Sequence, residues 1–533
     1  MKKPTLLEVD EQAFLLVSAR LEQGELHEAD YPMLKAAIET LLYLRRLLER
    51  KDTAMRRVLR MVFGASTEKT REIFGADEKP ECGKRAGRKK KKRKGHGRRA
   101  AAEYWGADNV QVLHDQLHAG QSCPDCDGGK LYDTSRPGTL IRLYAQPPVA
   151  GTVVEVQKLR CALCNQLFSA SPPPEAGTEK YDPNVGPMIA ILRYGYGMPM
   201  NRLEQMQEDF GVPLPAGTQW ELVDAHAREL APLGEELIRQ AAGADLFHND
   251  DTTVKILSVD QQIRNGEAEG LGGEKRRRGI FTTGIVAIKA DRKIALFFSG
   301  REHAGENLQK VLDERHKDLA APIQMSDGLN RNPPKTTETI QANCNAHGRR
   351  GFVDLAASFP EPCRYVLEKL KQVYEHDEQA RSENLDDDQR LLFHQQHSAK
   401  PMEQLKQWME QKIEGKEVEP NSSLGEAINY MLKRWERLTR FLTVPGAPLD
   451  NNICERVLKT AIRHRKNSLF YRTENGAQVG DLFMSLIHTC RLCRVNPFDY
   501  LTKLRRFADQ LGKDPGRWMP WNYQVTLATM PEG

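Results

Sequence analysis

The chain has 533 residues, of which 39% are hydrophobic and 28% charged, and its mean hydropathy is −0.60. This length exceeds what one hydrophobic core supports, so three or four domains are expected. No apolar run approaches the roughly 20 residues that a membrane-spanning helix needs, and the N-terminus lacks the pattern of a secretory signal, so we expect a cytoplasmic protein without membrane contact.

The first expected region, residues 1–75, is helical. From Leu34 to Val62, apolar residues recur alternately three and four positions apart, with only Lys51 breaking the pattern. This spacing predicts a coiled-coil-like helix and self-association into a homo-oligomer. The alternative is an amphipathic helix packed on its own domain.

The second region, residues 76–119, is expected to be a basic linker. The net charge of the chain is only +5, yet residues 84–99 carry eleven Lys or Arg and no acid. Such a local field favours a polyanionic partner, namely nucleic acid, although a solvated linker has the same composition. The candidate DNA-binding residues here are Lys89, Lys90, Lys91, Lys92, Arg93 and Lys94.

Residues 120–170 contain two C-x2-C pairs, which in a cytosolic chain indicate metal binding rather than disulfides. Two such knuckles complete a tetrahedral four-thiolate zinc site with no open position, so a structural Zn²⁺ in a zinc ribbon is predicted. Four free thiols are the alternative. A further pair, Cys490 and Cys493, lacks a second knuckle and is interpreted as core packing. The four predicted zinc ligands are Cys123, Cys126, Cys161 and Cys164.

The second half of the chain predicts a mixed α/β region with helical domains around it. Residues 171–242 are expected to be helical, with a turn at 214–218 that favours either a DNA-binding helix-turn-helix or a plain helical hairpin. Three β-rich runs (244–259, 278–290, 293–300), a helix (303–318) and a short apolar run (321–327) make up a region spanning 243–344. Residues 345–445 are charged and helical, 446–510 contain two more helices, and 511–533 are a C-terminal tail.

Acidic residues occupy three informative places in this order of elements. Asp250 and Asp251 lie in the first β-rich run, Asp327 ends the fourth, and Glu455 begins a late helix. That layout predicts a ribonuclease H-like catalytic core, in which carboxylates hold two Mg²⁺ (or Mn²⁺) ions for phosphodiester chemistry. Each acid also has an ordinary explanation as a turn, a strand end or a helix N-terminus. Neighbouring strand residues point to opposite faces, so the pattern does not choose between Asp250 and Asp251.

Several segments resemble the transposases of insertion-sequence-66-type elements, a DDE transposase family with a ribonuclease H-like core. HNDDTTVKIL (248–257) is similar to the family's first-acid strand, QMSDG (324–328) to its second-acid motif and CNAHGRRGFVDL (344–355) to its Cys-Trp-Ala-His-Ala-Arg-Arg segment. LDNNICERVLKTAIRHRKNSLF (449–470) matches its most specific signature, DNNxxER followed by RKNxLF. The zinc knuckles and NPFDYLTKL (496–504) also fit.

The resemblance implies metal-dependent cleavage and strand transfer at the ends of an insertion sequence. It assigns Asp250, Asp327 and Glu455 as catalytic, metal-binding acids and 345–445 as a helical insertion within the catalytic core. It also implies DNA ends and target DNA as partners, a homo-oligomer on DNA, and helper proteins from the same element. Basic motif positions expected to contact DNA are Arg349, Arg350, Arg456, Arg465 and Lys466.

This chain departs from the family pattern at three positions. Asn249 stands where the family has Ala, Asn345 where it has Trp, and Leu329 where an aromatic residue is expected. None of these changes removes a predicted metal ligand. Two other functions fit the same residues: a DNA-binding protein with an inactive nuclease core, and a ribonuclease H-like nuclease without joining activity.

Overall fold

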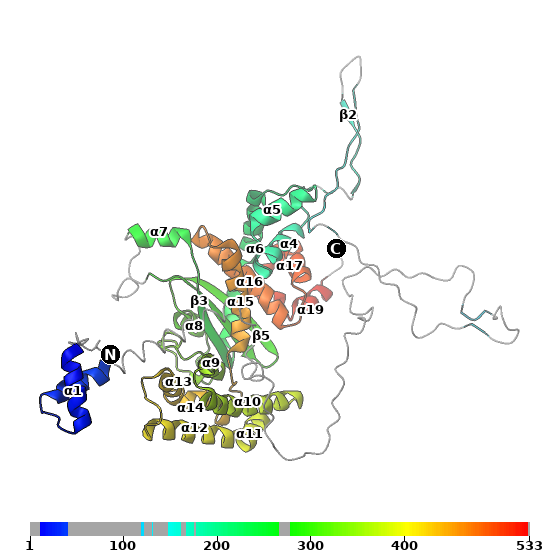
Figure 1. The fold of residues 1–533 in the computed structure, drawn as a ribbon. Helices are drawn as coiled ribbons and strands as arrows, with labels where there is room; N and C mark the ends of the chain where they lie inside the picture. The colour runs from blue at the N-terminus through cyan, green and yellow to red at the C-terminus, as the bar shows by residue number, and fades with distance from the viewer. Residues whose placement is uncertain are drawn as a thin grey trace. The chain divides into compact units, whose positions relative to one another are not determined.

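The computed structural model describes residues 11–40, 119–121, 130–131, 146, 148–160, 167–174, 177, 179–265 and 278–530 (Figure 1). The chain divides into two compact units, one made of Met1–Glu78 and Gly151–Gly533, the other of Lys79–Ala150. Within the described residues, no helix combines the length and the apolar character needed to span a membrane.

The N-terminal region is described only in part. Helix α1 spans Glu11–Gln23, and residues 30–40 are also helical. The Arg20 guanidinium pairs with the Asp30 carboxylate at 3.0 Å and joins these two helical segments. The predicted coiled-coil seam begins in the second segment, and its positions from Leu41 to Val62 lie outside the described residues. Self-association therefore stays a prediction.

The centre of the larger unit is a five-stranded mixed sheet with the strand order β5-β4-β3-β6-β7. β3 pairs antiparallel with β4 and parallel with β6, β4 pairs antiparallel with β5, and β6 pairs parallel with β7. The strands are β3 (Leu246–Thr253), β4 (Phe281–Lys289), β5 (Arg292–Gly300), β6 (Ile323–Ser326) and β7 (Ile340–Asn343). The mixed α/β expectation is therefore confirmed.

Two details of the sheet differ from the sequence prediction. β7 was not predicted, because a four-residue strand with polar Gln341 and Asn343 carries no alternating or apolar signal. The first β-rich run also ends early, at Thr253, and Leu257 begins helix α7 (Leu257–Asn265). Tertiary pairing decides this boundary, since the Leu257 N–H donates to the Tyr471 carbonyl at 2.9 Å.

Helix α16 (Glu474–Leu492) protects the β5 edge of the sheet. An open strand edge presents unpaired N–H groups that invite association, so natural sheets cover it. Here three side chains spaced four residues apart on one face of α16 take the place of a neighbouring strand. The N–H groups of β5 donate to them at 2.6–3.0 Å: Ser299 to Asp481, Phe297 to Ser485 and Ala295 to Thr489. Cys490 of this helix is fully buried, as core packing requires.

Helices that precede and follow the five strands in sequence complete the α/β region. Before the sheet come α4 (Val185–Ala190), the π-helix η3 (Ile191–Gly195), α5 (Met200–Asp209) and α6 (Ala216–Ala242). After α16 come α17 (Pro497–Arg506), α18 (Ala508–Leu511), the 3-10 helix η6 (Pro515–Trp518) and α19 (Tyr523–Ala528). The expected tail is packed: Trp518 and Tyr523 are buried, and the Tyr500 hydroxyl donates to the Trp518 carbonyl at 2.7 Å.

The helical stretch between β7 and α15 (Asn452–Ser468) builds its own hydrophobic core and gathers beneath the sheet in Figure 1. We call residues 345–445 the insertion. Its apolar residues, such as Leu367, Leu405 and Ile428, are fully buried against one another. Its helices are α9 (Asn345–Leu355), α10 (Pro360–Ser382), α11 (Asp387–His397), α12 (Ala399–Glu414), α13 (Ser423–Leu432), α14 (Trp435–Leu438) and the 3-10 helix η5 (Arg440–Leu442).

Candidate active site

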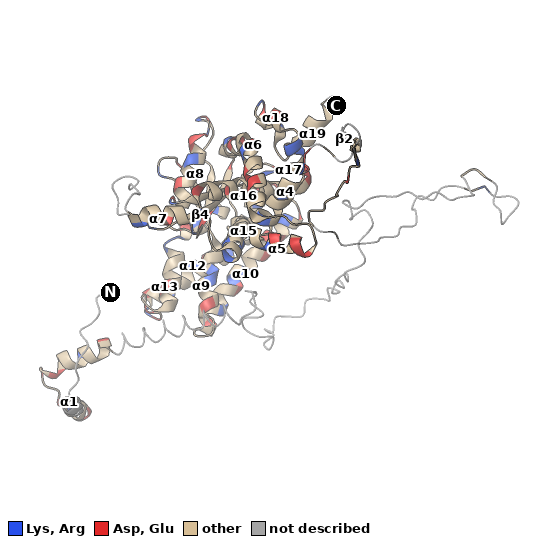
Figure 2. Cartoon of the chain, turned by 90° about the horizontal axis from the view of Figure 1, so that it is seen from above, with Lys and Arg blue, Asp and Glu red and all other residues tan. Residues whose placement is uncertain are grey.

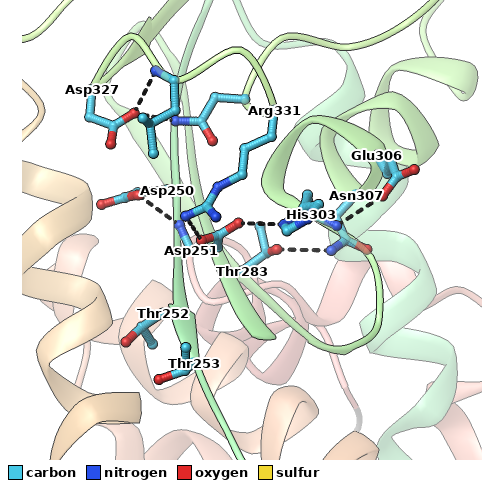
Figure 3. A network of polar contacts seen from close by, with 12 residues as sticks. Asp250, Asp251, Thr252, Thr253, Thr283, His303, Glu306, Asn307, Asp327 and Arg331 are labelled. Carbon is cyan, nitrogen blue, oxygen red and sulfur yellow. Dashed lines mark hydrogen bonds and ion pairs between the residues drawn. The ribbon is translucent and has the colours of Figure 1, made fainter. Parts of the chain in front are cut away.

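The two neighbouring acids of β3 point to opposite faces of the sheet, as strand geometry requires (Figure 3). The Asp251 carboxylate, 1% exposed, pairs with Arg331 at 2.8 Å and with the His303 ring at 3.2 Å. His303 is the N-cap of α8 (Ala304–Asp313), so α8 covers this face. Asp250 points to the other face and lies on the same side of β3 as Asp327.

Asp327 follows the last residue of β6, the strand that pairs with β3. One of its carboxylate oxygens, Oδ1, accepts hydrogen bonds from the Asn332 side chain at 2.5 Å and from the Leu329 N–H at 3.0 Å. Gly328 follows with a φ of +82°, a conformation in which glycine is favoured because it has no Cβ. Asp327 lies near enough to Asp250 for its charge to raise the pKa of Asp250.

The N-terminal end of α15 is fixed against the Asp250 face by three contacts. The Asn451 side chain donates to the Asn249 carbonyl at 3.2 Å, and the Cys454 thiol donates to the Gly284 carbonyl at 3.2 Å. Gly284 is the cross-strand partner of Asp250, and a Cβ there would lie 2.8 Å from the Leu458 side chain. Glycine at 284 therefore permits the close approach that brings Glu455 to the site.

Glu455 lies in the first turn of α15 and is half-buried. Its Oε1 atom is 3.6 Å from His347 Nδ1, and its Oε2 atom is 3.7 Å from the Arg350 guanidinium, both from α9 of the insertion. Oε1 is buried without a hydrogen-bond partner. Ligand atoms of Glu455, His347 and Cys344 lie within 4.8 Å of one another, but burial raises the pKa of the Cys344 thiol to about 12 and keeps it protonated.

The electrostatics of Asp250 couple this residue to the other two predicted acids, Asp327 and Glu455. Burial, together with the negative charges of Asp327, Asp251 and Glu455, raises the pKa of Asp250 to about 7, against one hydrogen bond from the Asp251 N–H. Carboxylates placed this close repel one another unless a proton or a cation is shared between them. The sequence predicted these acids in separate elements, and in the fold Asp327 and Glu455 lie near enough to Asp250 for their charges to raise its pKa.

These residues fit a divalent cation. The donor set is made of carboxylate oxygens, which Mg²⁺ and Mn²⁺ prefer. Asp250 faces other acids whose charges help to raise its pKa to about 7, and the Oε1 atom of Glu455 has no hydrogen-bond partner, so both could accept a cation. Asp251 does not fit, because Arg331 and His303 already occupy both of its oxygens.

The predicted DNA-contacting residues occupy different surroundings. Arg456 and Lys466 are exposed on α15, and Arg349 and Arg350 are half-buried on α9. The Arg465 guanidinium turns inward and donates to the Thr253 carbonyl at 2.5 Å. The basic run 84–99 and the four predicted zinc ligands lie outside the described residues, the second cysteine pair falling in sequence between the antiparallel strands β1 (Lys158–Arg160) and β2 (Leu167–Ser169).

Sequence reasoning missed two insertion residues that hold the Asp327 turn. The Tyr430 hydroxyl donates to the Asp327 carbonyl at 2.8 Å, and the Arg434 guanidinium donates to the Gly328 carbonyl at 3.3 Å. Arg434 also stacks over the Tyr430 ring, 4.2 Å from its centroid. Both residues are about a hundred positions from Asp327 in sequence, and no local pattern marks them.

Two departures from the family pattern acquire a structural role. Asn249 is buried and donates to the Asn332 carbonyl at 2.8 Å, while the Gln324 side chain donates to its Oδ1 atom. Asn345 is also buried and donates to the Leu438 carbonyl at 2.9 Å. Leu329, the third departure, is exposed on the Asp327 turn. Polar partners therefore accompany both buried substitutions.

The model of the "Transposase IS66 family" matches residues 180–479, from the helices before the sheet to the first turns of α16. The chain belongs to this transposase family. The match includes β3, β6, α15 and the whole insertion, so all three acids lie within the part that defines the family. The family assignment gives the chain a transposase role.

Three curated relatives from Sinorhizobium fredii (strain NBRC 101917 / NGR234) are similar to this chain, and each is described as an uncharacterized protein. Protein y4hP is 25% identical over 453 residues, covering 79% of this chain and 77% of the relative. Protein y4jD is 26% identical and covers 59% of this chain and 60% of its own length. Protein y4qI is 27% identical, with 63% and 61% covered. These relatives support the family assignment without adding an activity.

Proposed function

We propose that this transposase cuts insertion-sequence ends and joins them to target DNA with divalent metal ions held by Asp250, Asp327 and Glu455. The observation that carries the proposal is the convergence of these acids on one face of the sheet, with a raised pKa at Asp250. The strand order β5-β4-β3-β6-β7, with the first three strands antiparallel and the last two parallel to β3, supports a ribonuclease H-like core.

Contacts within the protein hold each of the three proposed metal ligands and support the proposal. Asp250 is fixed by β3, Asp327 by its bonds to Asn332 and the Leu329 N–H, and Glu455 by the attachment of α15 to Asn249 and Gly284. When bound, two Mg²⁺ or Mn²⁺ ions supply Lewis acidity to the phosphate and activate the attacking water or 3′-hydroxyl. Such prepositioning reduces the reorganisation that the reaction requires.

His347 and Arg350 neighbour Glu455 from the insertion and are suited to the substrate phosphate. The His347 ring and the Arg350 guanidinium both lie within 4 Å of the Glu455 carboxylate, and the proposal puts the scissile phosphate beside them. We assign them to phosphate positioning and assign Asp251 to holding the α8 side of the sheet. Structural zinc, helper proteins and a homo-oligomer on DNA remain predictions of the sequence.

The experiment that tests the proposal is a cleavage and strand-transfer assay. Its substrates are labelled duplexes made from the DNA that flanks this chain's coding sequence, with Mg²⁺, Mn²⁺ or EDTA. We expect metal-dependent cutting that Glu455→Gln lowers at least about a thousandfold, because removing a metal-binding carboxylate removes transition-state stabilisation of about 4 kcal/mol. DNA binding by this variant should persist.

Glu474→Gln is the matched control, since Glu474 is an exposed acid in the first turn of the next helix, α16. It should cut like the wild type. Equal activity of Glu455→Gln and the wild type would remove Glu455 from the mechanism. Cleavage without joining would instead identify a nuclease that lacks strand transfer.

A further inference from the structure

The outer face of α15 carries an uninterrupted row of cations. Between Glu455 and Glu474 the sequence contains no Asp or Glu. Four basic residues in this stretch are spaced three, four and three apart, which places them on one face of the helix. Basic residues are blue and acidic residues red in Figure 2, where α15 is labelled. All four residues of the row are exposed: Arg456, Lys459, Arg463 and Lys466. The row is about 15 Å long, at 1.5 Å per helical residue.

These four cations lack acidic partners among the described residues, where no carboxylate forms an ion pair with any of them. Other surface cations of the chain do have such partners, for example Lys310 with Glu302 and Lys335 with Glu306. A row of uncompensated cations attracts a polyanion rather than a small acidic molecule. The row also starts next to Glu455, so a polyanion bound along it leads into the site.

The row ends in an exposed apolar turn. Leu469 is 65% exposed and Phe470 is 37% exposed, directly after the last turn of α15. Leu469 adopts a φ of +67°, which a residue with a branched apolar side chain rarely does. The chain thus holds two apolar side chains in solvent at the cost of an unfavourable backbone conformation.

The structure fixes this turn from both sides. Before it, the Arg465 guanidinium is bound to Thr252 and Thr253, and the Asn467 side chain donates to the Gly197 carbonyl at 2.9 Å. After it, the Tyr471 N–H donates to the Lys255 carbonyl at 2.9 Å, and Ile256 pairs with Tyr471 in a β-bridge. Leu469 and Phe470 are therefore displayed by a rigid support that also includes the end of β3.

We propose that this surface holds duplex DNA, with the cation row on the phosphates and Leu469 and Phe470 inserted at a base step. The inference rests on the proposed function, because it takes DNA as the substrate. Apolar side chains inserted between base pairs unstack them, and neighbouring cations hold the distorted backbone. Two apolar residues framed by cations are too small a surface for a stable protein partner, which needs about 800 Å² per side.

The location of the turn gives the inserted pair a function in the reaction. Leu469 is fourteen residues after Glu455, so the turn lies about 20 Å from the acids along α15. DNA that is opened there is distorted roughly six base pairs from the cutting position, at 3.4 Å per pair. The inserted pair would therefore set the register of the DNA end relative to Asp250, Asp327 and Glu455.

The test uses the full chain and the flanking-DNA duplexes described above, each with 2-aminopurine in place of one adenine, in Ca²⁺ or EDTA. 2-Aminopurine becomes brighter when it is unstacked. The wild type should brighten one position, and Leu469→Asn/Phe470→Ala should lose that signal and bind about tenfold more weakly with an unchanged salt dependence. Asn is found at positive φ more often than most residues, so it is chosen at 469 to disturb the backbone as little as possible. Leu392→Ala, at another exposed leucine, is the control.

The contribution of the cation row is measured separately, from the salt dependence of DNA binding. Lys459→Gln/Arg463→Gln/Lys466→Gln should lower the slope of log affinity against log salt by about 2.7, or 0.9 for each phosphate that the protein no longer neutralises. An unchanged slope, or the same 2-aminopurine signal in Leu469→Asn/Phe470→Ala as in the wild type, would overturn the inference. If the wild type still cuts in Mg²⁺ under that outcome, the proposed function stands. A wild type that neither binds nor cuts these duplexes contradicts both.

Discussion

The sheet and the insertion both bury carboxylates, and the surroundings of these carboxylates are opposite. In the insertion, Asp377 is 3% exposed and pairs with Arg390 and Arg381, each at 2.6 Å, and with His394 at 3.3 Å. Burial alone would raise the pKa of Asp377, but the His394 hydrogen bond and the two guanidinium charges hold it below its usual value.

On the sheet, Asp250 has no such partners and faces other acids instead, so burial and like charge raise its pKa to about 7. The comparison separates two uses of a buried acid. A carboxylate paired with cations of the protein stabilises the fold, whereas a buried carboxylate that faces other acids is available to share a proton or a metal ion with them. The same contrast holds between Asp251, which is paired, and its neighbour Asp250.

The largest expected effect is on the rate of DNA cleavage, and it distinguishes Asp250 from Asp251. Asp250→Asn should lower metal-dependent DNA cleavage at least about a thousandfold, because it removes a metal ligand. Asp251→Asn should lower it by no more than about tenfold, through loosening of Arg331 and His303. The check is single-turnover cleavage of the flanking-DNA duplexes by both variants. A greater loss in Asp251→Asn would reverse the assignment of the two faces.

The sequence alone could not decide whether Asp250 or Asp251 is the metal ligand. The β-rich runs and the family-like motifs locate Asp250, Asp327 and Glu455 in their elements, because strand and helix patterns are local. Which β3 face meets α15 depends on the close packing of Leu458 on Gly284, more than 170 residues apart in sequence. Periodicity therefore leaves Asp250 and Asp251 equivalent, and the tertiary contact distinguishes them.

The contacts that the insertion makes with the Asp327 turn also could not be predicted from the sequence. Residues 345–445 were predicted to be helical, but that prediction did not include the hydrogen bonds of Tyr430 and Arg434 to the carbonyls of Asp327 and Gly328. Contacts to backbone carbonyls leave no sequence signature, because any donor of suitable length serves. β7 was missed for a related reason, since its four residues gain their strand conformation from pairing with β6.

The second-largest expected effect is on stability and concerns Asp377, the paired acid of the insertion. Asp377→Asn should lower the free energy of unfolding by about 3 kcal/mol, because Arg390 and His394 lose the charge that compensates them. Thermal unfolding at constant pH measures this, with Glu375→Gln on the same helix as the control. Glu375 is 63% exposed in its ion pair with Lys371, so its loss should cost less than about 1 kcal/mol. Equal effects of the two variants would show that burial of the Asp377 pairs adds nothing.

A smaller effect of the opposite sign is expected at the sheet. In EDTA at pH 8, Asp250→Asn should raise the free energy of unfolding by about 2 kcal/mol, because it removes one charge from a crowded group. Mn²⁺ should then stabilise the wild type but leave this variant unchanged, since only the wild type retains the full ligand set. Thermal unfolding with and without Mn²⁺ gives both numbers. A variant less stable than the wild type in EDTA would show that Asp250 is compensated within the protein.

The smallest effect is a pH dependence that arises from the β5 edge. Burial raises the pKa of Asp481 from its ordinary value of 3.8 to about 7, although two hydrogen bonds from Ser299 act against the shift. The native protein therefore holds a proton that the unfolded chain releases, so this contribution to stability is lost as pH rises through 7. Asp481→Asn, which cannot lose that proton, should gain about 1 kcal/mol over the wild type between pH 5 and pH 8. Parallel pH curves from thermal unfolding would refute this assignment.

The most direct test of the central claim is anomalous diffraction from Mn²⁺-soaked crystals of the full chain. We expect manganese bound by Asp250 and Asp327, with Glu455 as a further ligand and no manganese at Asp251. Because anomalous signal locates the ion, a zinc site elsewhere in the chain would not confuse the result. Manganese on Asp251, or manganese bound elsewhere in the protein but absent from the three acids, would contradict a metal-dependent site on this face of the sheet.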